Sequence, residues 1–152
     1  MKVSDIMTQA IVTDAADDTL AQAAVKMREQ QTGSLLIMDG DRLLGIFTER
    51  DLVKSVASGH DPNSVLLKDI MTTNIVTISP NTTLHEAAAV MAAKWIRHLP
   101  VVEGDKVHGM VSQRDLAGFL AQLLNEPEEQ SLTETELVRA RRLKRIQAGD
   151  LD

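Results

Sequence analysis

The stretch Asp5-Ile6-Met7-Thr8 recurs sixty-four positions later as Asp69-Ile70-Met71-Thr72, and this repetition decides how the chain folds. The same offset aligns further residues without a gap, namely Ile11-Val12-Thr13 with Ile75-Val76-Thr77, Thr19-Leu20 with Thr83-Leu84, Gly45 with Gly109, and Arg50-Asp51-Leu52 with Arg114-Asp115-Leu116. Because the identities include turn glycines and a charged pair, shared composition does not explain them. The sequence therefore predicts two copies of one structural unit.

Each copy is expected to form a strand, a helix, a two-stranded hairpin and a second helix. In the first copy, β-branched residues 11–13 predict the strand, and residues 34–38 and 43–48 predict the hairpin around Asp39-Gly40. The first helices should follow capping boxes, Thr19-x-x-Gln22 and Thr83-x-x-Glu86. In the second copy, the strands are expected at 75–77, 98–102 and 107–112. The closing helices should begin near Glu49 and Gln113.

One copy holds roughly 60 residues, which makes it marginal as an independent domain because its sheet and helices leave apolar faces exposed. We therefore expect an α+β fold (α/β-like) in which two β-α-β-β-α motifs pack face to face with pseudo-twofold symmetry and a cleft on each side. The expected divisions are residues 1–66, residues 67–125, and a helical tail at 126–152.

Composition excludes several classes of function. Aromatic residues make up 2% of the chain and the net charge is −6, which disfavours nucleic acid as a partner. The absence of cysteine excludes disulfides and thiolate metal sites. The N-terminus carries no apolar signal core and no stretch is long enough to span a membrane, so a cytoplasmic location without membrane association is expected.

A hydroxyl residue stands three positions before an aspartate at the end of the last strand of each copy. These pairs are Thr48 with Asp51 and Ser112 with Asp115, and an arginine, Arg50 or Arg114, precedes each aspartate. The carboxylate could accept hydrogen bonds from ribose hydroxyls, while the hydroxyl, the arginine and the helix amides could hold a phosphate. For a single copy, an ordinary helix cap would be the better interpretation of this pattern. Two copies at equivalent positions favour a ligand site.

These motifs resemble the CBS domain, named after cystathionine β-synthase, over residues 2 to about 124. The resemblance rests on Asp-Ile-Met-Thr, Ile-Val-Thr, the Thr-Leu helix start and Gly-x-x-Thr/Ser-x-x-Asp. It implies a Bateman module, a paired CBS unit whose cleft binds AMP, ADP, ATP or another adenosyl compound. It also implies site residues, with ribose on Asp51 and Asp115, a hydroxyl at Thr48 and Ser112, and adenine against Ile11, Val12, Thr13, Ile75, Val76 and Thr77.

The second copy also carries Arg97-His98, which resembles the basic dipeptide that many CBS domains place near phosphate. The alternative is that both side chains sit on an exposed strand edge. The first copy has Gly33-Ser34 at the equivalent positions, so the two clefts should be unequal.

The sequence thus predicts a stand-alone regulatory module, not an enzyme, which needs no cofactor and uses an adenine nucleotide as its regulatory ligand. We expect a homodimer that signals to a regulated protein the sequence does not identify. The alternatives are a ligand-free dimerisation module and a sensor of S-adenosylmethionine or NAD. The methionines are expected in the core and Trp95 partly buried, and the scattered histidines do not predict a metal site. A third capping box, Ser131-x-x-Glu134, predicts a tail helix that packs on its own chain or on a second subunit; the alternatives are a solvated tail and a docking patch for an acidic partner.

Overall fold

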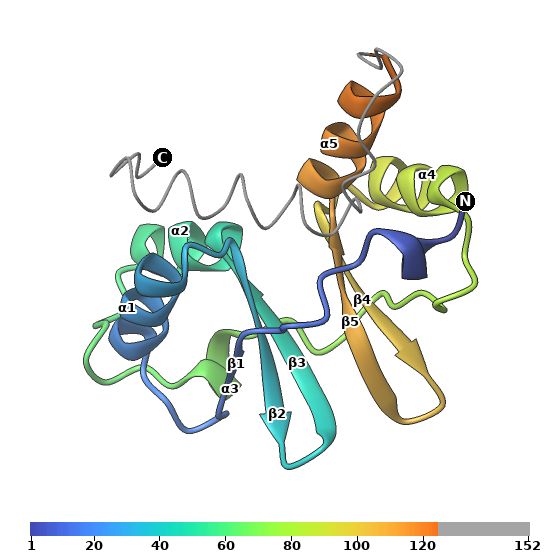
Figure 1. The fold of residues 1–152 in the computed structure, drawn as a ribbon. Helices are drawn as coiled ribbons and strands as arrows, with labels where there is room; N and C mark the ends of the chain where they lie inside the picture. Colours follow the sequence, from blue (N-terminus) through green and yellow to red (C-terminus); the bar gives the residue numbers. More distant parts are fainter. Residues whose placement is uncertain (125–152) are drawn as a thin grey trace. The chain divides into compact units, whose positions relative to one another are not determined.

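The computed structural model describes residues 1–124, and these form a mixed α+β fold (Figure 1). Its elements follow the repeat and are, in chain order, η1 (Val3–Asp5), β1 (Thr13–Asp14), α1 (Leu20–Gln30), β2 (Ser34–Asp39), β3 (Arg42–Thr48), α2 (Glu49–Ala57), α3 (Leu67–Ile70), α4 (Leu84–Lys94), β4 (His98–Glu103), β5 (Lys106–Ser112) and α5 (Gln113–Leu124). Both hairpins and all four main helices are confirmed. The predicted tail helix and its capping box lie outside the described residues.

The chain divides into two compact units. The first unit comprises Ala10–Val76 with Asp105–Val107, and the second comprises Met1–Gln9, Thr77–Gly104 and the described residues from His108 onward. We call them the first-repeat unit and the second-repeat unit, after the hairpin that dominates each. The leading segment of each sequence repeat, residues 1–9 or 67–76, belongs to the unit that carries the other repeat's hairpin.

In the first-repeat unit, β1, β2 and β3 form one sheet in that order (Figure 1). β1 runs parallel to β2 with Thr13 opposite Leu36, and β2 pairs antiparallel with β3 with Ser34 opposite Thr48. Helix α1 begins at the predicted box, where the Gln22 amide donates to Thr19 Oγ1 at 3.2 Å and the Thr19 amide to Gln22 Oε1 at 2.8 Å.

The second-repeat unit carries the hairpin β4–β5, and helix α4 begins at the equivalent box of Thr83 and Glu86. The strand predicted at 75–77 is wrong. Among the described residues, the only counterpart of β1 here is a single parallel bridge between Ile78 and Val101. In the first repeat the Leu36 amide donates to the Val12 carbonyl at 3.0 Å, but the aligned residue is Pro100, which has no N–H. The loss of this donor shortens the pairing.

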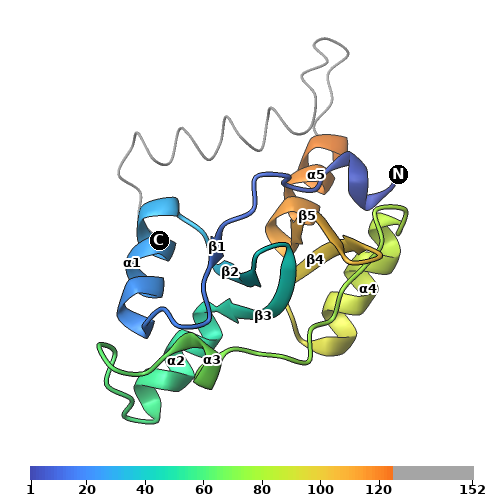
Figure 2. The same cartoon turned by 90° about the horizontal axis from the view of Figure 1, so that it is seen from below.

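In each unit, the leading segment pairs with the glycine-bearing strand, which is β3 with Gly45 or β5 with Gly109. Thr72 bridges antiparallel to Ile46 in the first-repeat unit, and Thr8 bridges Met110 at the equivalent place in the second. Both bridges are closed by two backbone hydrogen bonds of 2.8–3.0 Å. Figures 1 and 2 both show the N-terminal segment beside α4, where the Val3 amide donates to the Thr82 carbonyl at 2.8 Å.

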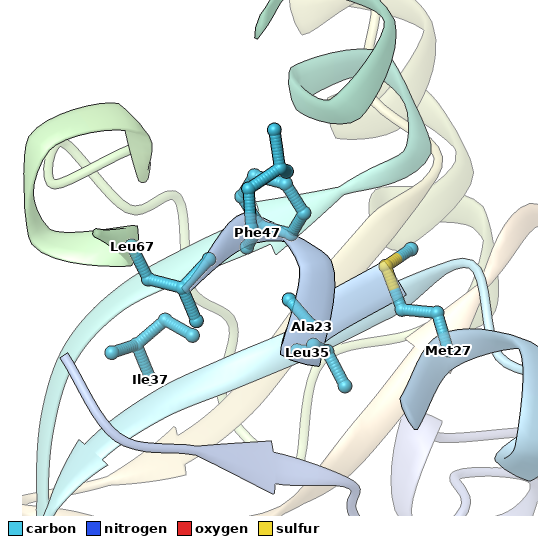
Figure 3. Close-up of a cluster of buried hydrophobic side chains, with 7 residues drawn as sticks. Ala23, Met27, Leu35, Ile37, Phe47 and Leu67 are labelled. Atoms are coloured by element: carbon cyan, nitrogen blue, oxygen red, sulfur yellow. The ribbon is translucent and has the colours of Figure 1, made fainter. Parts of the chain in front are cut away.

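The core of the first-repeat unit lies between α1, the sheet and α3 (Figure 3). Its buried members are the apolar stripe of α1 together with residues of the hairpin and the leading segment, namely Leu20, Ala23, Met27, Leu35, Ile37, Phe47 and Leu67. Burying a side chain of this size stabilises the fold by about 1.5–3 kcal/mol. Leu67 belongs by sequence to the second repeat, so the exchanged segment completes this core.

Two further expectations concern single residues. The predicted core methionines Met7, Met27 and Met91 are buried, and Met71 packs against the core cluster. The expected partial burial of Trp95 is wrong, since the side chain is 80% exposed. Trp95 follows the last residue of α4 and takes a left-handed backbone, φ 56°, which ends the helix there. Within residues 1–124, no helix is long and apolar enough to cross a membrane.

The close approach of the leading segments predicts that Gly109→Ala and Gly45→Ala both destabilise the protein. A Cβ at Gly109 would lie 2.7 Å from the Thr8 carbonyl oxygen, and one at Gly45 would lie 2.5 Å from Met71 Sδ. Overpacking of this kind costs about 1–3 kcal/mol. Gly109→Ala should cost more, because a backbone carbonyl yields less than a methionine side chain. Thermal unfolding measures both, and an unchanged midpoint for Gly109→Ala would contradict the pairing.

Candidate functional site

The first candidate site lies where β3 ends and α2 begins. The Thr48 amide and hydroxyl both donate to Asp51 Oδ2, at 3.0 and 3.3 Å, and the Thr72 hydroxyl approaches Asp51 Oδ1 at 3.5 Å. Asp51 is buried, whereas Arg50 is exposed in the first turn of α2. The carboxylate is thus held in place from both its own strand end and the exchanged segment.

The second candidate site repeats this arrangement where β5 meets α5. The Ser112 amide and hydroxyl donate to Asp115 Oδ2 at 2.7 and 2.8 Å, and the Asp115 amide donates back to Ser112 Oγ at 3.2 Å. Arg114 is exposed between them. In both units the aspartate therefore caps its helix, the simpler of the two roles that the sequence pattern left open.

Capping reduces what the helix start can offer an anion. Of the four amides that an α-helix leaves unsatisfied at its start, three are used in α5: those of Ser112 and Asp115 as described, and that of Gln113, which donates to the Arg97 carbonyl at 2.9 Å. In α2 the Glu49 amide donates to the Gly33 carbonyl in the same way, at 3.1 Å. Positive charge for a phosphate must come mainly from side chains.

The second-repeat unit has such side chains around His98, the first residue of β4. Burial, together with the nearby charges of Arg97 and Arg114, lowers the pKa of His98 from 6.5 to about 4. The imidazole is therefore neutral at pH 7, and the two guanidinium groups supply the positive charge. At the equivalent place in the first-repeat unit, Gly33 has no side chain and Ser34 is buried.

The predicted adenine-contacting segments are partly buried. Ile11, Val12 and Thr13 lead into β1 at the edge of its sheet, and the Val12 carbonyl accepts from the Leu36 amide. Ile75 and Val76 are likewise half-buried, while Thr77 is exposed. Whether these residues bind a ligand stays a prediction.

Sequence reasoning missed one group of charged residues beside β1. Lys26 donates from Nζ to the Thr13 carbonyl at 2.9 Å and to Asp14 Oδ1 at 3.0 Å, and Asp18 lies next to Asp14. The signal was present, because the second repeat has neutral residues, Ile78, Thr82 and Val90, at the three aligned positions. Among the described residues, no group of three or more His, Cys, Asp or Glu side chains could hold a metal ion.

Comparison with known protein families shows to which family the chain belongs. The CBS domain model matches residues 3–58 and again residues 67–122. The chain belongs to the CBS-domain family. It is 32% identical over 132 residues to the CBS domain-containing protein YhcV of Bacillus subtilis, covering 86% of this chain and 92% of that protein. It is 35% identical over 119 residues to an uncharacterized protein of Methanopyrus kandleri, covering 76% of this chain but only 61% of that relative.

Solved structures of CBS proteins have the same fold. The CBS domain pair of protein MJ0100, solved in complex with 5′-methylthioadenosine and S-adenosyl-L-methionine, is 26% identical with a TM-score of 0.73, covering 80% of this chain and 96% of that one. A hexameric CBS-CP12 protein from bloom-forming cyanobacteria is 31% identical with a TM-score of 0.72, covering 96% of this chain and 86% of that one. The expected CBS-pair fold is thereby confirmed.

The lowered pKa of His98 predicts that this residue destabilises the protein in acid. The folded-state pKa of about 4 lies below the ordinary 6.5, so the unfolded chain takes up a proton first as the pH falls. Stability should be unaffected above pH 6.5 and should fall between pH 6.5 and 4, by up to about 3 kcal/mol. Urea unfolding at several pH values should show this loss in the wild type and a smaller one in His98→Gln. Equal losses in both proteins would contradict the assignment.

Proposed function

We propose that this chain is a regulatory CBS pair that binds an adenosine-containing ligand, AMP, ADP or ATP, and transmits the ligand state to a partner protein. The observation that carries the proposal is the duplicated arrangement of a carboxylate beside a strand-end hydroxyl, buried at Asp51 and half-buried at Asp115. Asp51 and Asp115 occupy equivalent places in the two units, each fixed by hydrogen bonds to its own strand end.

Each aspartate has the capacity to bind ribose while it caps its helix. A carboxylate offers about four lone-pair positions, and the cap uses those of Oδ2. We propose that two adjacent ribose hydroxyls would donate to Oδ1 in competition with its present contacts, such as the Thr72 hydroxyl 3.5 Å from Asp51 Oδ1, as ribose does to an acidic residue in dinucleotide-binding folds. Because the cap holds the carboxylate rigidly, little conformational entropy would be lost on binding. Capping and ribose binding are therefore compatible roles of one side chain.

The choice of a phosphorylated ligand rests on the second-repeat unit. The charges of Arg97 and Arg114 both contribute to the lowered pKa of His98, so both guanidinium groups act electrostatically at this place. Charge-assisted hydrogen bonds from guanidinium groups to phosphate are among the strongest in proteins. A phosphate would also favour protonation of His98, which adds a further donor. The MJ0100 domain pair with two adenosyl compounds supports an adenosyl ligand, and S-adenosylmethionine is the main alternative.

The proposed output is a change in conformation or assembly. A ligand can shift such an equilibrium only by its differential affinity for the two states. We propose a homodimer as the responding assembly, located in the cytoplasm. The kinship with a hexameric CBS protein supports self-association as a property within the family. The chain would act by binding and not by catalysis.

Thermal unfolding with a ligand series tests the proposal. AMP, ADP, ATP, NAD, S-adenosylmethionine and 2′-deoxy-AMP are each added at high excess. At about 100 times its dissociation constant, a ligand should stabilise the protein by about 2.7 kcal/mol, which raises the midpoint by several degrees. Ribonucleotides should stabilise the protein more than the deoxy analogue. Absence of any shift with every adenosyl compound would overturn the proposal in favour of a ligand-free dimerisation module.

The same scan on Asp51→Asn and Asp115→Asn identifies the working unit. Asparagine keeps an oxygen for the helix cap but loses the negative charge, so the effect on ribose binding is separated from loss of the cap. The control variants are Asp41→Asn and Asp105→Asn, which alter exposed turn residues that the repeat also relates. At least one site variant should lose the ligand-induced shift, and both controls should retain it.

A double variant, Arg97→Gly with His98→Ser, tests the phosphate assignment. It gives the second repeat the Gly33-Ser34 sequence of the first. Loss of charge-assisted bonds worth about 1.5–3 kcal/mol should weaken AMP or ATP binding by roughly 10- to 100-fold, measured by calorimetry. Binding of adenosine or 5′-methylthioadenosine, which lack phosphate, should change little. Equal losses for both kinds of ligand would contradict a phosphate role.

A further inference from the structure

A buried carboxylate oxygen in the first-repeat unit has no hydrogen-bond partner. Asp14 is 8% exposed, and its Oδ1 accepts from Lys26 Nζ at 3.0 Å. Its other oxygen, Oδ2, is shielded from solvent and accepts nothing. An uncompensated buried acceptor destabilises the folded state, and more so if the group is charged. Lys26 therefore provides a hydrogen bond to only one of the two carboxylate oxygens of Asp14.

The neighbour of Asp14 is a second carboxylate, that of Asp18. Asp18 is held by the Ala15 amide, which donates to its Oδ2 at 3.0 Å. Two ionised carboxylates facing each other make no hydrogen bond, because both only accept. One proton between them converts the contact into a strong hydrogen bond and removes one of two like charges.

In the second repeat, the residues aligned with this carboxylate pair and its lysine carry no ionisable group. Ile78 aligns with Asp14 and is similarly buried, at 9% exposed, and Val90 aligns with Lys26. Thr82 aligns with Asp18 and accepts from the Ser79 amide at 3.1 Å, as Asp18 accepts from Ala15. The fold therefore accommodates an apolar side chain at this buried position. The carboxylate, its neighbour and the lysine are particular to the first repeat.

We propose that Asp14 and Asp18 form a proton-binding site, in which a proton taken from solvent bridges Asp14 Oδ2 and the Asp18 carboxylate while Lys26 neutralises the remaining negative charge. The proton would tie the end of β1 to the loop that leads into α1. Lys26 joins the same end to α1 through the Thr13 carbonyl. The aligned residues of the second repeat, Ile78, Thr82 and Val90, are neutral, so this proton would bind in the first-repeat unit only.

The electrostatics of the two groups agree with a shared proton. Burial first, and then the Asp18 carboxyl, raise the pKa of Asp14, with Lys26 opposing them. The proximity of the Asp14 carboxyl, followed by the hydrogen bond from the Ala15 amide, lowers the pKa of Asp18, and the charge of Lys26 adds to this. The nearby pair of Asp17 and Lys68, 2.7 Å apart, lies on the exposed side of the loop.

The sign of the pH dependence follows from these directions. As the pH falls through the raised pKa of Asp14, the folded state takes up the proton first and gains stability. As the pH falls further through the lowered pKa of Asp18, the unfolded state takes up more protons and the stabilisation is lost. The contribution of the pair should therefore be largest between the two values.

Carboxyl-detected NMR on the full chain without ligand tests the proposal directly, independently of any nucleotide binding. The Asp14 and Asp18 signals should titrate in two coupled steps separated by more than about one pH unit, the first above and the second below 3.8. Two independent titrations within one pH unit of each other would overturn the proposal, and this measurement needs no variant to fold.

Urea unfolding of variants across the same pH range gives a second readout. Asp14→Asn keeps the shape of the side chain, and the triple variant Asp14→Ile, Asp18→Thr and Lys26→Val gives this place the chemistry of the second repeat. The stability difference between wild type and either variant should pass through a maximum in the window between the two steps. The control Asp17→Asn alters a 79% exposed side chain of the same loop. Because it leaves Asp14, Asp18 and Lys26 in place, its stability should still exceed that of the site variants by an amount that is largest in that window. A difference that does not vary with pH would contradict the shared proton.

Discussion

The antiparallel contact between a leading segment and a glycine-bearing strand is the constraint on which the rest of each unit depends. Thr72 meets Ile46 in one unit and Thr8 meets Met110 in the other. Only glycine at positions 45 and 109 lets the incoming backbone approach so closely. The same contact completes a hydrophobic core with Leu67 and brings the Thr72 hydroxyl to the Asp51 carboxylate. Core packing and site geometry therefore share one cause.

Duplication of this arrangement has not produced two identical units. Both keep the helix cap formed by the strand-end hydroxyl and the aspartate, because the cap stabilises the fold whatever the ligand. The units differ at positions where the fold accepts side chains of different chemistry. The second carries basic side chains around His98, and the first carries a buried carboxylate with a lysine beside it. A regulatory protein with two such units could respond to two different signals, one in each repeat.

The sequence predicted the candidate site better in residue identity than in contact. Thr48, Asp51, Ser112 and Asp115 were predicted from their spacing, their duplication and the resemblance to CBS domains, and the structure places each aspartate beside its hydroxyl, while their role in ligand binding stays a prediction. The pattern could not show that most first-turn amides of α5 are already used, because the Gln113 amide finds its acceptor, the Arg97 carbonyl, across the hairpin. Similarly, the sequence did not show that Pro100 would shorten the strand pairing. This became apparent only because the aligned residue, Leu36, donates its amide to the Val12 carbonyl.

By itself, the sequence determined the repeat, the two hairpins, the starts of the main helices and the capping boxes, since these depend on local periodicity and on contacts three or four residues apart. Only the tertiary structure decided which leading segment joins which hairpin, how exposed Trp95 is, and that Asp14 is buried against Asp18 and Lys26. These outcomes depend on the approach of segments distant in the chain and on the solvent they exclude. Periodicity carries no information about either.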